Sequence, residues 1–134
     1  AKWHGAGHQL VVVVSAMSGE TNRLIALAKQ IQAQPDPREL DVIAATGEQV
    51  TIGLLTMALK QLGLNAKSYT GGQVRVLTDS AFTKARILEI DDAKLRADLD
   101  GGTVIVVAGF QGVDQDARGE HFQIVLGGAA IGEF

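Results

Sequence analysis

Four consecutive valines at residues 11–14 constrain this chain more than any other feature of its sequence. A strand that is apolar on every residue is buried on both faces, which is typical of a parallel sheet. The valines run into a short turn of small residues at 15–19, and an amphipathic pattern begins directly after it. A second apolar run, at 103–108, ends in the Gly-Phe-Gln-Gly sequence of residues 109–112.

The two apolar strands together predict a ligand site. In open α/β sheets, ligands bind at the carboxyl ends of the strands, so two neighbouring strands open their turns on the same edge. Ser18 is a candidate N-cap for the helix that follows the first turn. Because a helix N-terminus favours negative charge, we expect this site to bind an anionic ligand.

Two amphipathic helices are predicted in the first half of the chain. The first covers residues 19–33, with its apolar positions on one face. Residues 38–45 fit a short helix or a strand equally well. Thr46 and Gln49 have the spacing of a capping box, which predicts that the second helix starts there and covers residues 48–62.

The second half of the chain alternates extended and helical patterns. Gly63 stands where a C′ residue belongs after the second helix. A strand is expected at 64–69, an irregular excursion or hairpin rather than a second sheet core at 74–90, and a short helix at 91–99. This order predicts an α/β fold, with a mostly parallel sheet flanked by helices in three αβα layers.

Length and composition limit the classes of protein that fit. We expect residues 1–134 to form a single, truncated domain with an atypical tail at 120–134. The net charge of −3 and the scarcity of aromatic residues argue against a nucleic-acid surface. No apolar run approaches the ~20 residues of a membrane span. The absence of cysteine excludes disulfides and thiolate metal sites, so the reducing cytoplasm is the expected compartment.

Local patterns alone do not decide the chemistry. The phosphate-loop, dinucleotide and nucleophile-elbow signatures are absent, and the three histidines lack metal-ligand spacing, so no metal site is expected. Ser15, Ser18 and Thr21 are also explained as turn and capping residues. Glu48, near a predicted helix start, is also explained by the helix dipole, which is worth about 0.3–1 kcal/mol. The turn at 109–112 is also explained as a plain strand exit.

Several segments together resemble one enzyme family. VVVVSAMSGETNRL at 11–24, TGEQVT at 46–51, SYTG at 68–71, LTDS at 77–80 and AGFQG at 108–112 recur in the order found in aspartokinases, which belong to the amino acid kinase family. The resemblance covers about residues 7–119. The resemblance implies an amino acid kinase-like fold. It also implies an enzyme that uses ATP and Mg²⁺ to phosphorylate the side-chain carboxylate of L-aspartate. That reaction is the first step of lysine, threonine and methionine biosynthesis.

The resemblance also implies roles for four residues. Ser15 and Thr21 match positions that hold the carboxylates of the substrate, and Glu48 matches the acid that pairs with its α-ammonium group. Phe110 lies in the turn that closes over the amino acid. No catalytic residue is assigned, because a carboxylate with a pKa near 3.9 is already ionised and needs no general base. The cofactor-binding residues are unknown.

Departures from the family pattern limit what this chain is expected to do alone. The Lys-Phe-Gly-Gly-Thr-Ser loop, whose lysine contacts the phosphates in the family, is missing. Residues 121–129 preserve only a Leu-Gly echo of the segment that carries the family's substrate arginine. We therefore expect the chain alone to bind ATP and Mg²⁺ poorly and to be inactive or nearly so.

Two other interpretations stay open. The first is another amino acid kinase, acting on glutamate or acetylglutamate. The second is a truncated or engineered fragment that folds without catalytic function and self-associates. An exposed sheet edge or helix face is expected to make the chain a homo-oligomer.

Overall fold

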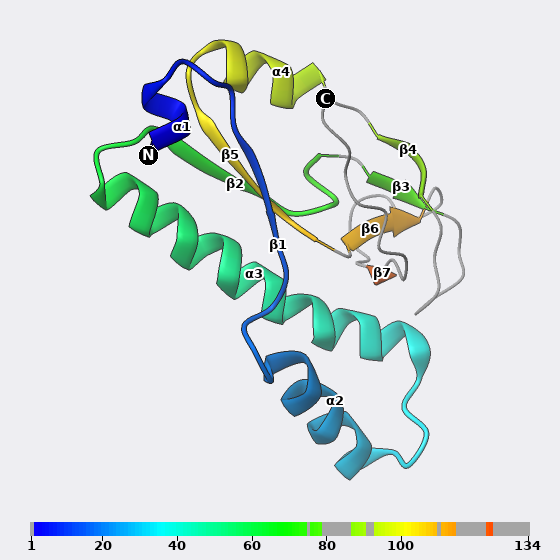
Figure 1. Ribbon diagram of the computed structural model, residues 1–134. Coiled ribbons are helices and arrows are strands. Elements are labelled where there is room, and N and C mark those ends of the chain that lie inside the picture. The colour runs from blue at the N-terminus through cyan, green and yellow to red at the C-terminus, as the bar shows by residue number, and fades with distance from the viewer. Residues whose placement is uncertain are drawn as a thin grey trace.

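The computed structural model describes residues 2–74, 76–78, 87–90, 93–109, 111–114 and 123–124 (Figure 1). Its elements follow in chain order: α1 (Lys2–Gly5), β1 (Val11–Val14), α2 (Glu20–Ile31), α3 (Pro37–Gln61), β2 (Ala66–Tyr69), β3 (Val76–Thr78), β4 (Ile87–Ile90), α4 (Ala93–Asp100), β5 (Val104–Ala108), β6 (Gln111–Asp114) and β7 (Gln123–Ile124).

A three-stranded parallel sheet forms the centre of the fold. Its strand order is β1-β5-β2, so the two apolar strands of the sequence are neighbours. Val14 is paired with Ala108, and Tyr69 is paired with Val107. The predicted parallel α/β sheet is confirmed. The expected burial of residues 11–14 on both faces is wrong, because β1 lies at the edge of this sheet and its valines alternate between exposed and half-buried.

The sheet is covered on both faces. Side chains of β5 alternate between the faces, as the pleat of a strand requires. Val106 and Ala108 pack with Ile52 of α3, and Ile105 packs with Tyr69 and Val74 on the side of α4. The long helix α3 crosses one side of the sheet and α4 lies on the other (Figure 1). The three predicted layers are therefore present.

α3 is one continuous helix of 25 residues, so the predicted start at Thr46 is wrong. Asp36 caps it instead, because its side chain accepts a hydrogen bond from the N–H of Glu39 at 3.1 Å, and Pro37 follows at a position that suits proline. The Thr46 hydroxyl donates to the carbonyl of Ile43 at 2.7 Å, as a threonine inside a helix does. Residues 38–45 are therefore helical.

The far end of α3 is as predicted. Gly63 has a φ of +80°. Its N–H donates to the carbonyl of Lys60 at 2.9 Å, and the N–H of Leu64 donates to the carbonyl of Leu59 at 3.1 Å. These two bonds make the Schellman arrangement, and the expected C′ position of Gly63 is confirmed.

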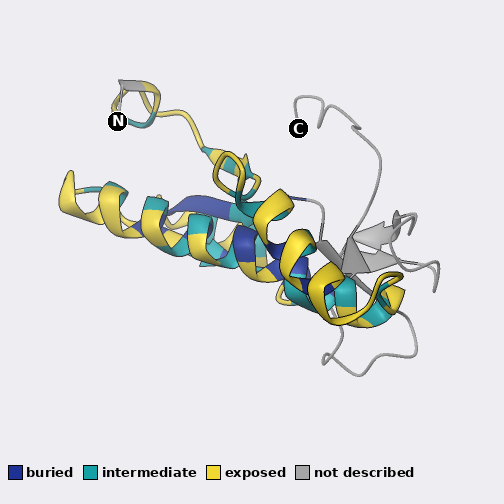
Figure 2. Cartoon of the chain, turned by 90° about the horizontal axis from the view of Figure 1, so that it is seen from below, coloured by how far each residue is buried: buried dark blue, intermediate teal, exposed yellow. Residues whose placement is uncertain are grey.

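By length and composition, α3 is also long and apolar enough to cross a membrane. A helix in the core of an α/β domain passes the same test. α3 packs against β1, β2 and β5 (Figure 1) and buries the carboxylates of Asp41 and Glu48. Figure 2 shows buried and exposed residues along its length, which is the pattern of a helix with one side on a core.

A second sheet of four strands, in the order β4-β3-β6-β7, differs from expectation. β3 and β4 do form the antiparallel hairpin predicted within residues 74–90. However, β3 also pairs in parallel with β6, and β6 pairs with β7. The expected absence of a second sheet is wrong, because local periodicity carries no information about a partner strand more than thirty residues further along the chain.

A buried tyrosine ties β2 to α4. Tyr69 is 2% exposed, and its hydroxyl donates to Oδ2 of Asp98. Lys67 Nζ lies 3.1 Å from the same oxygen. The hydrogen bond from Tyr69, followed by that from Lys67, lowers the pKa of the Asp98 carboxyl below its ordinary value. Burial, followed by the hydrogen bond to Asp98, raises the pKa of Tyr69.

Tyr69→Phe is expected to lower the free energy of unfolding by about 1–2 kcal/mol at pH 7, because it removes a hydrogen bond to a charged group. A lowered folded-state pKa stabilises the fold above the unfolded value and loses that contribution as the pH falls through the folded one. The effect of the substitution is therefore expected to shrink as the pH falls below 3.8, the ordinary pKa of an aspartate side chain.

Urea unfolding at pH 7, 5 and 3 measures this change. Lys67→Met is the control, because its half-exposed ammonium group contributes less than the buried hydroxyl. An equal stability of Tyr69→Phe and the parent chain at pH 7 contradicts the proposed tie.

Candidate functional site at the carboxyl edge of the sheet

The two strand exits lie side by side, as the sequence predicted. Val14 and Ala108 are paired at the ends of β1 and β5. One residue further on, the N–H of Gly109 donates to the carbonyl of Val14 at 2.7 Å. Ser15 and Gly109 therefore leave the sheet together, at the edge where α/β proteins bind ligands.

The start of α2 lies directly after the first exit. Gly19, with a φ of 78°, is the N-cap, so the predicted cap at Ser18 is wrong. The left-handed backbone at this position favours glycine, and no side chain caps the helix. Thr21 is half-buried in the first turn. The N–H groups of this turn are suited to an anion.

The neighbouring acid of that turn, Glu20, is held by Arg23. The two guanidinium contacts are 2.7 and 3.0 Å long. The hydrogen bond from Arg23 is the main cause of the lowered pKa of Glu20. Arg23 and Glu20 therefore compensate each other's charge, and the net contribution of the pair to anion binding is small.

α3 brings Glu48 to the same edge. A Cβ atom placed on Gly47, the residue before Glu48, would lie 2.9 Å from Cβ of Ala16 in the first exit and 3.5 Å from Cγ of Glu20 in α2. Glu48 is 7% exposed, and its Oε2 atom is buried. Because α3 begins at Pro37, Glu48 lies in the middle of a helix, and the explanation by the helix dipole is wrong. Burying a carboxylate is costly unless it is hydrogen-bonded or paired, so Glu48 is an unusual residue for the interior of a helix.

Three of the four predicted site residues belong to segments that meet at this edge: Ser15 follows β1, Thr21 lies in the first turn of α2, and Glu48 follows Gly47 in α3. Ser15 is exposed, Thr21 is half-buried and Glu48 is buried. Phe110 lies outside the described residues. The roles of all four in binding remain predictions.

Sequence reasoning missed a second buried acid. Asp41 is 0% exposed and precedes Glu48 by two helical turns, about 10.5 Å along the axis on the same face of α3. With residues 38–45 undecided, the phase of the helix at this position was also undecided. The Asp36-Pro37 pair is the signal that could have extended the helix back to include Asp41.

The edge is poor in positive charge. Residues 15–21, 44–52 and 69–74 contain no lysine or arginine. Hydroxyls, helix N–H groups and a buried carboxylate suit a small zwitterion, whereas a triphosphate needs cations that these segments lack. The residues described here therefore do not fit the nucleotide. Within the described ranges, no group of three or more His, Asp or Glu side chains is arranged to hold a metal ion.

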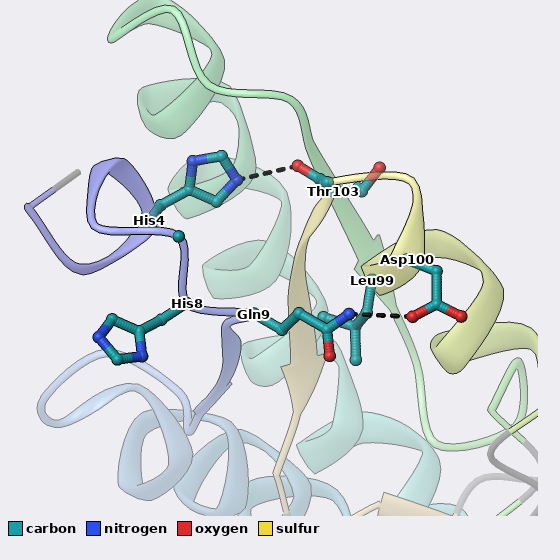
Figure 3. Close-up of a pocket in the computed structure, with 8 residues that line it drawn as sticks. His4, His8, Gln9, Leu99, Asp100 and Thr103 are labelled. Atoms are coloured by element: carbon teal, nitrogen blue, oxygen red, sulfur yellow. Dashed lines mark hydrogen bonds between the residues drawn. The ribbon is translucent and has the colours of Figure 1, made fainter.

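A surface pocket lies at the opposite end of the strands (Figure 3). Nε2 of His4 donates to the carbonyl of Gly102 at 2.9 Å, and Nε2 of Gln9 donates to Oδ1 of Asp100 at 2.9 Å. These bonds join the segment before β1 to the turn before β5. Polar groups that line this pocket are therefore engaged in contacts between the two segments.

The protein is an α/β domain with a parallel sheet between helical layers and polar groups where the strands end. Its sequence also matches the model of one protein family. The model described as "Amino acid kinase family" matches residues 1–130. The chain belongs to the amino acid kinase family.

Several similar proteins are named aspartate kinase or aspartokinase. "Aspartate kinase" of Pseudomonas putida is 72% identical over 114 residues, which are 85% of this chain and 28% of that protein. A crystal structure of aspartate kinase from Synechocystis has a TM-score of 0.70 at 41% identity, covering 94% of this chain and 20% of that chain. E. coli aspartokinase III, in complex with aspartate and ADP, shares the fold, with a TM-score of 0.75 at 17% identity over 90% of this chain and 38% of that chain. The predicted resemblance is confirmed, and the chain spans a little over a quarter of its curated relatives.

Proposed function

We propose that this chain is the amino-acid-binding part of an aspartate kinase, which transfers the γ-phosphoryl group of ATP to the side-chain carboxylate of L-aspartate. The observation that carries the proposal is a buried acid, Glu48, whose neighbour Gly47 lies close to the strand exit that bears Ser15 and to the first turn of α2, which bears Thr21. The 72% identity to the Pseudomonas putida protein named aspartate kinase supports it.

The proposed chemistry requires little more than positioning. The attacking carboxylate of aspartate is ionised at neutral pH, so no general base has to remove a proton. The Ser15 and Thr21 hydroxyls donate hydrogen bonds to the substrate carboxylates, next to the open N-terminus of α2. Holding the nucleophile at a fixed place supplies much of the rate enhancement in phosphoryl transfer.

We assign to Glu48 the selectivity for an amino acid over a dicarboxylate that lacks an ammonium group. Its carboxylate pairs with the α-ammonium group of the amino acid in a site with little access to water. A dicarboxylate without an ammonium group leaves that charge without its ligand partner, which costs binding free energy. The nucleotide, Mg²⁺ and the catalytic cations are assigned to other parts of the enzyme. Consistent with the absence of cysteine, we place the enzyme in the cytoplasm and in the biosynthesis of aspartate-derived amino acids.

A hybrid enzyme tests the proposal. This chain replaces the matching 114-residue segment of the Pseudomonas putida aspartate kinase, and ADP release is measured with aspartate, glutamate and N-acetylglutamate. Turnover is expected with aspartate alone, while the chain by itself is expected to be inactive. Turnover with another acceptor favours a different amino acid kinase, and a folded hybrid without aspartate-dependent turnover contradicts the proposal.

Glu48→Gln in the hybrid enzyme is expected to raise the KM for aspartate about 10–100-fold, because it removes a charge-assisted hydrogen bond. Competition by succinate, which lacks the ammonium group, is expected to become stronger, because the substitution removes the charge that succinate leaves without a ligand partner. Glu39→Gln, the same change at an exposed position of the same helix, is the matched control. A parallel loss of aspartate and succinate binding would argue that Glu48 acts on the fold instead.

We further propose that the chain forms homo-oligomers. Among the described strands, β1 pairs with β5 alone, and Val11 and Val13 are exposed on it. The outer face of α3 presents a second apolar surface, made of Val50, Leu54 and Met57. An exposed sheet edge invites pairing with another chain.

Light scattering after size-exclusion chromatography measures the mass of this chain and of two variants. Val13→Lys is expected to reduce association if the sheet edge is the interface, and Leu54→Lys if the helix face is. A monomeric parent chain at about 100 μM would rule out stable association through either surface.

A further inference from the structure

The first strand exit is packed directly on the backbone of α3 at Gly47, which is buried. A Cβ atom on this residue would lie 2.9 Å from Cβ of Ala16 and 3.5 Å from both Cγ of Glu20 and Cδ1 of Leu24. Two carbon atoms in favourable contact are about 3.5–4.0 Å apart. The contact to Ala16 therefore leaves no room for a side chain at position 47.

Gly53, a second glycine of the same helix, shows that the need for a glycine is specific to position 47. A Cβ atom on Gly53 would meet no atom of the described residues within 4 Å. Glycine is among the poorest residues for a helix interior, so helix formation favours neither glycine. Of the two, Gly47 alone is required by a close approach.

The contact lies next to every described residue of the proposed aspartate site. Ala16 follows Ser15, Glu20 precedes Thr21, and Gly47 precedes Glu48. The distance between α3 and the first exit therefore sets the distance between the hydroxyls on one side and the Glu48 carboxylate on the other. A rigid contact of small groups holds that distance with little freedom.

We propose that Gly47 is a positioning residue that sets the length of the amino-acid site and so favours aspartate over the longer glutamate. The inference rests on the proposed function. A methyl group at position 47 pushes the exit away from α3 by roughly 0.6–1 Å. A displacement of about 1 Å can reduce a rate by about 100-fold. Because the displacement lengthens the site, it weakens the binding of aspartate more than the binding of glutamate.

Gly47→Ala in the hybrid enzyme tests the inference. The kcat/KM for aspartate is expected to fall about 10–100-fold, chiefly through KM, and the ratio of aspartate to glutamate turnover is expected to fall with it. The KM for ATP is expected to stay within about twofold, since the contact lies on the amino-acid side; a general loss of structure would move both KM values. Gly53→Ala, the same substitution without the contact, is expected to leave the aspartate kinetics unchanged.

The double variant Ala16→Gly/Gly47→Ala moves the methyl group from one side of the contact to the other. The aspartate KM of the double variant is expected to lie close to that of Ala16→Gly alone and well below that of Gly47→Ala, because the effects of substitutions at contacting residues are coupled. Equal aspartate kinetics in Gly47→Ala and Gly53→Ala overturn the inference, and so does a loss that the double variant does not relieve. If Gly47→Ala does not fold, the double variant provides the test. A folded double variant with an aspartate KM close to that of Ala16→Gly supports the inference, and any other result overturns it. A parent hybrid without aspartate-dependent turnover points instead to failure of the proposed function.

Discussion

The double-sided burial of β5 is the constraint on which the rest of the structure depends. Val104, Ile105 and Val106 are each at most 1% exposed, which requires a layer of side chains on both faces of the sheet. α3 covers one face and α4 the other, and β1 and β2 occupy the two edges of β5. This arrangement brings the end of β1 beside the end of β5, and the candidate site lies where both strands stop.

The continuous helix α3 connects this core to the site. Its buried face carries apolar residues where it crosses the sheet, such as Ile52, and two acids, Glu48 next to the contact with the first strand exit and Asp41 two turns earlier. A buried carboxylate is costly, whereas an alanine or leucine at the same position would stabilise the helix. Two buried acids on one helix face therefore depend on polar or charged groups in the packing around them.

Some of this could be predicted because the signals are local. The valines of β1, the amphipathic pattern of α2 and the glycine after α3 each specify an element through its own neighbours. The start of α3 could not be predicted in the same way, because Thr46 and Gln49 match a capping box that the structure does not use. Both Thr46 and the Asp36-Pro37 pair have the local pattern of a helix start. Packing of α3 on the sheet favours the longer helix, which starts at Pro37. For the site, the sequence pointed to Ser15, Thr21 and Glu48, but it could not show that Ala16 touches Gly47.

Local patterns in the sequence were enough to predict the class of fold, the burial of β5 on both faces and the polar residues that follow β1. Hydrophobic periodicity and turn residues act over a few positions, so they are readable without coordinates. Only the tertiary structure decided that α3 is continuous, that β3 and β6 join a second sheet, and that Glu48 is buried beside the first strand exit. These features depend on contacts between residues distant in the chain, which no local pattern encodes.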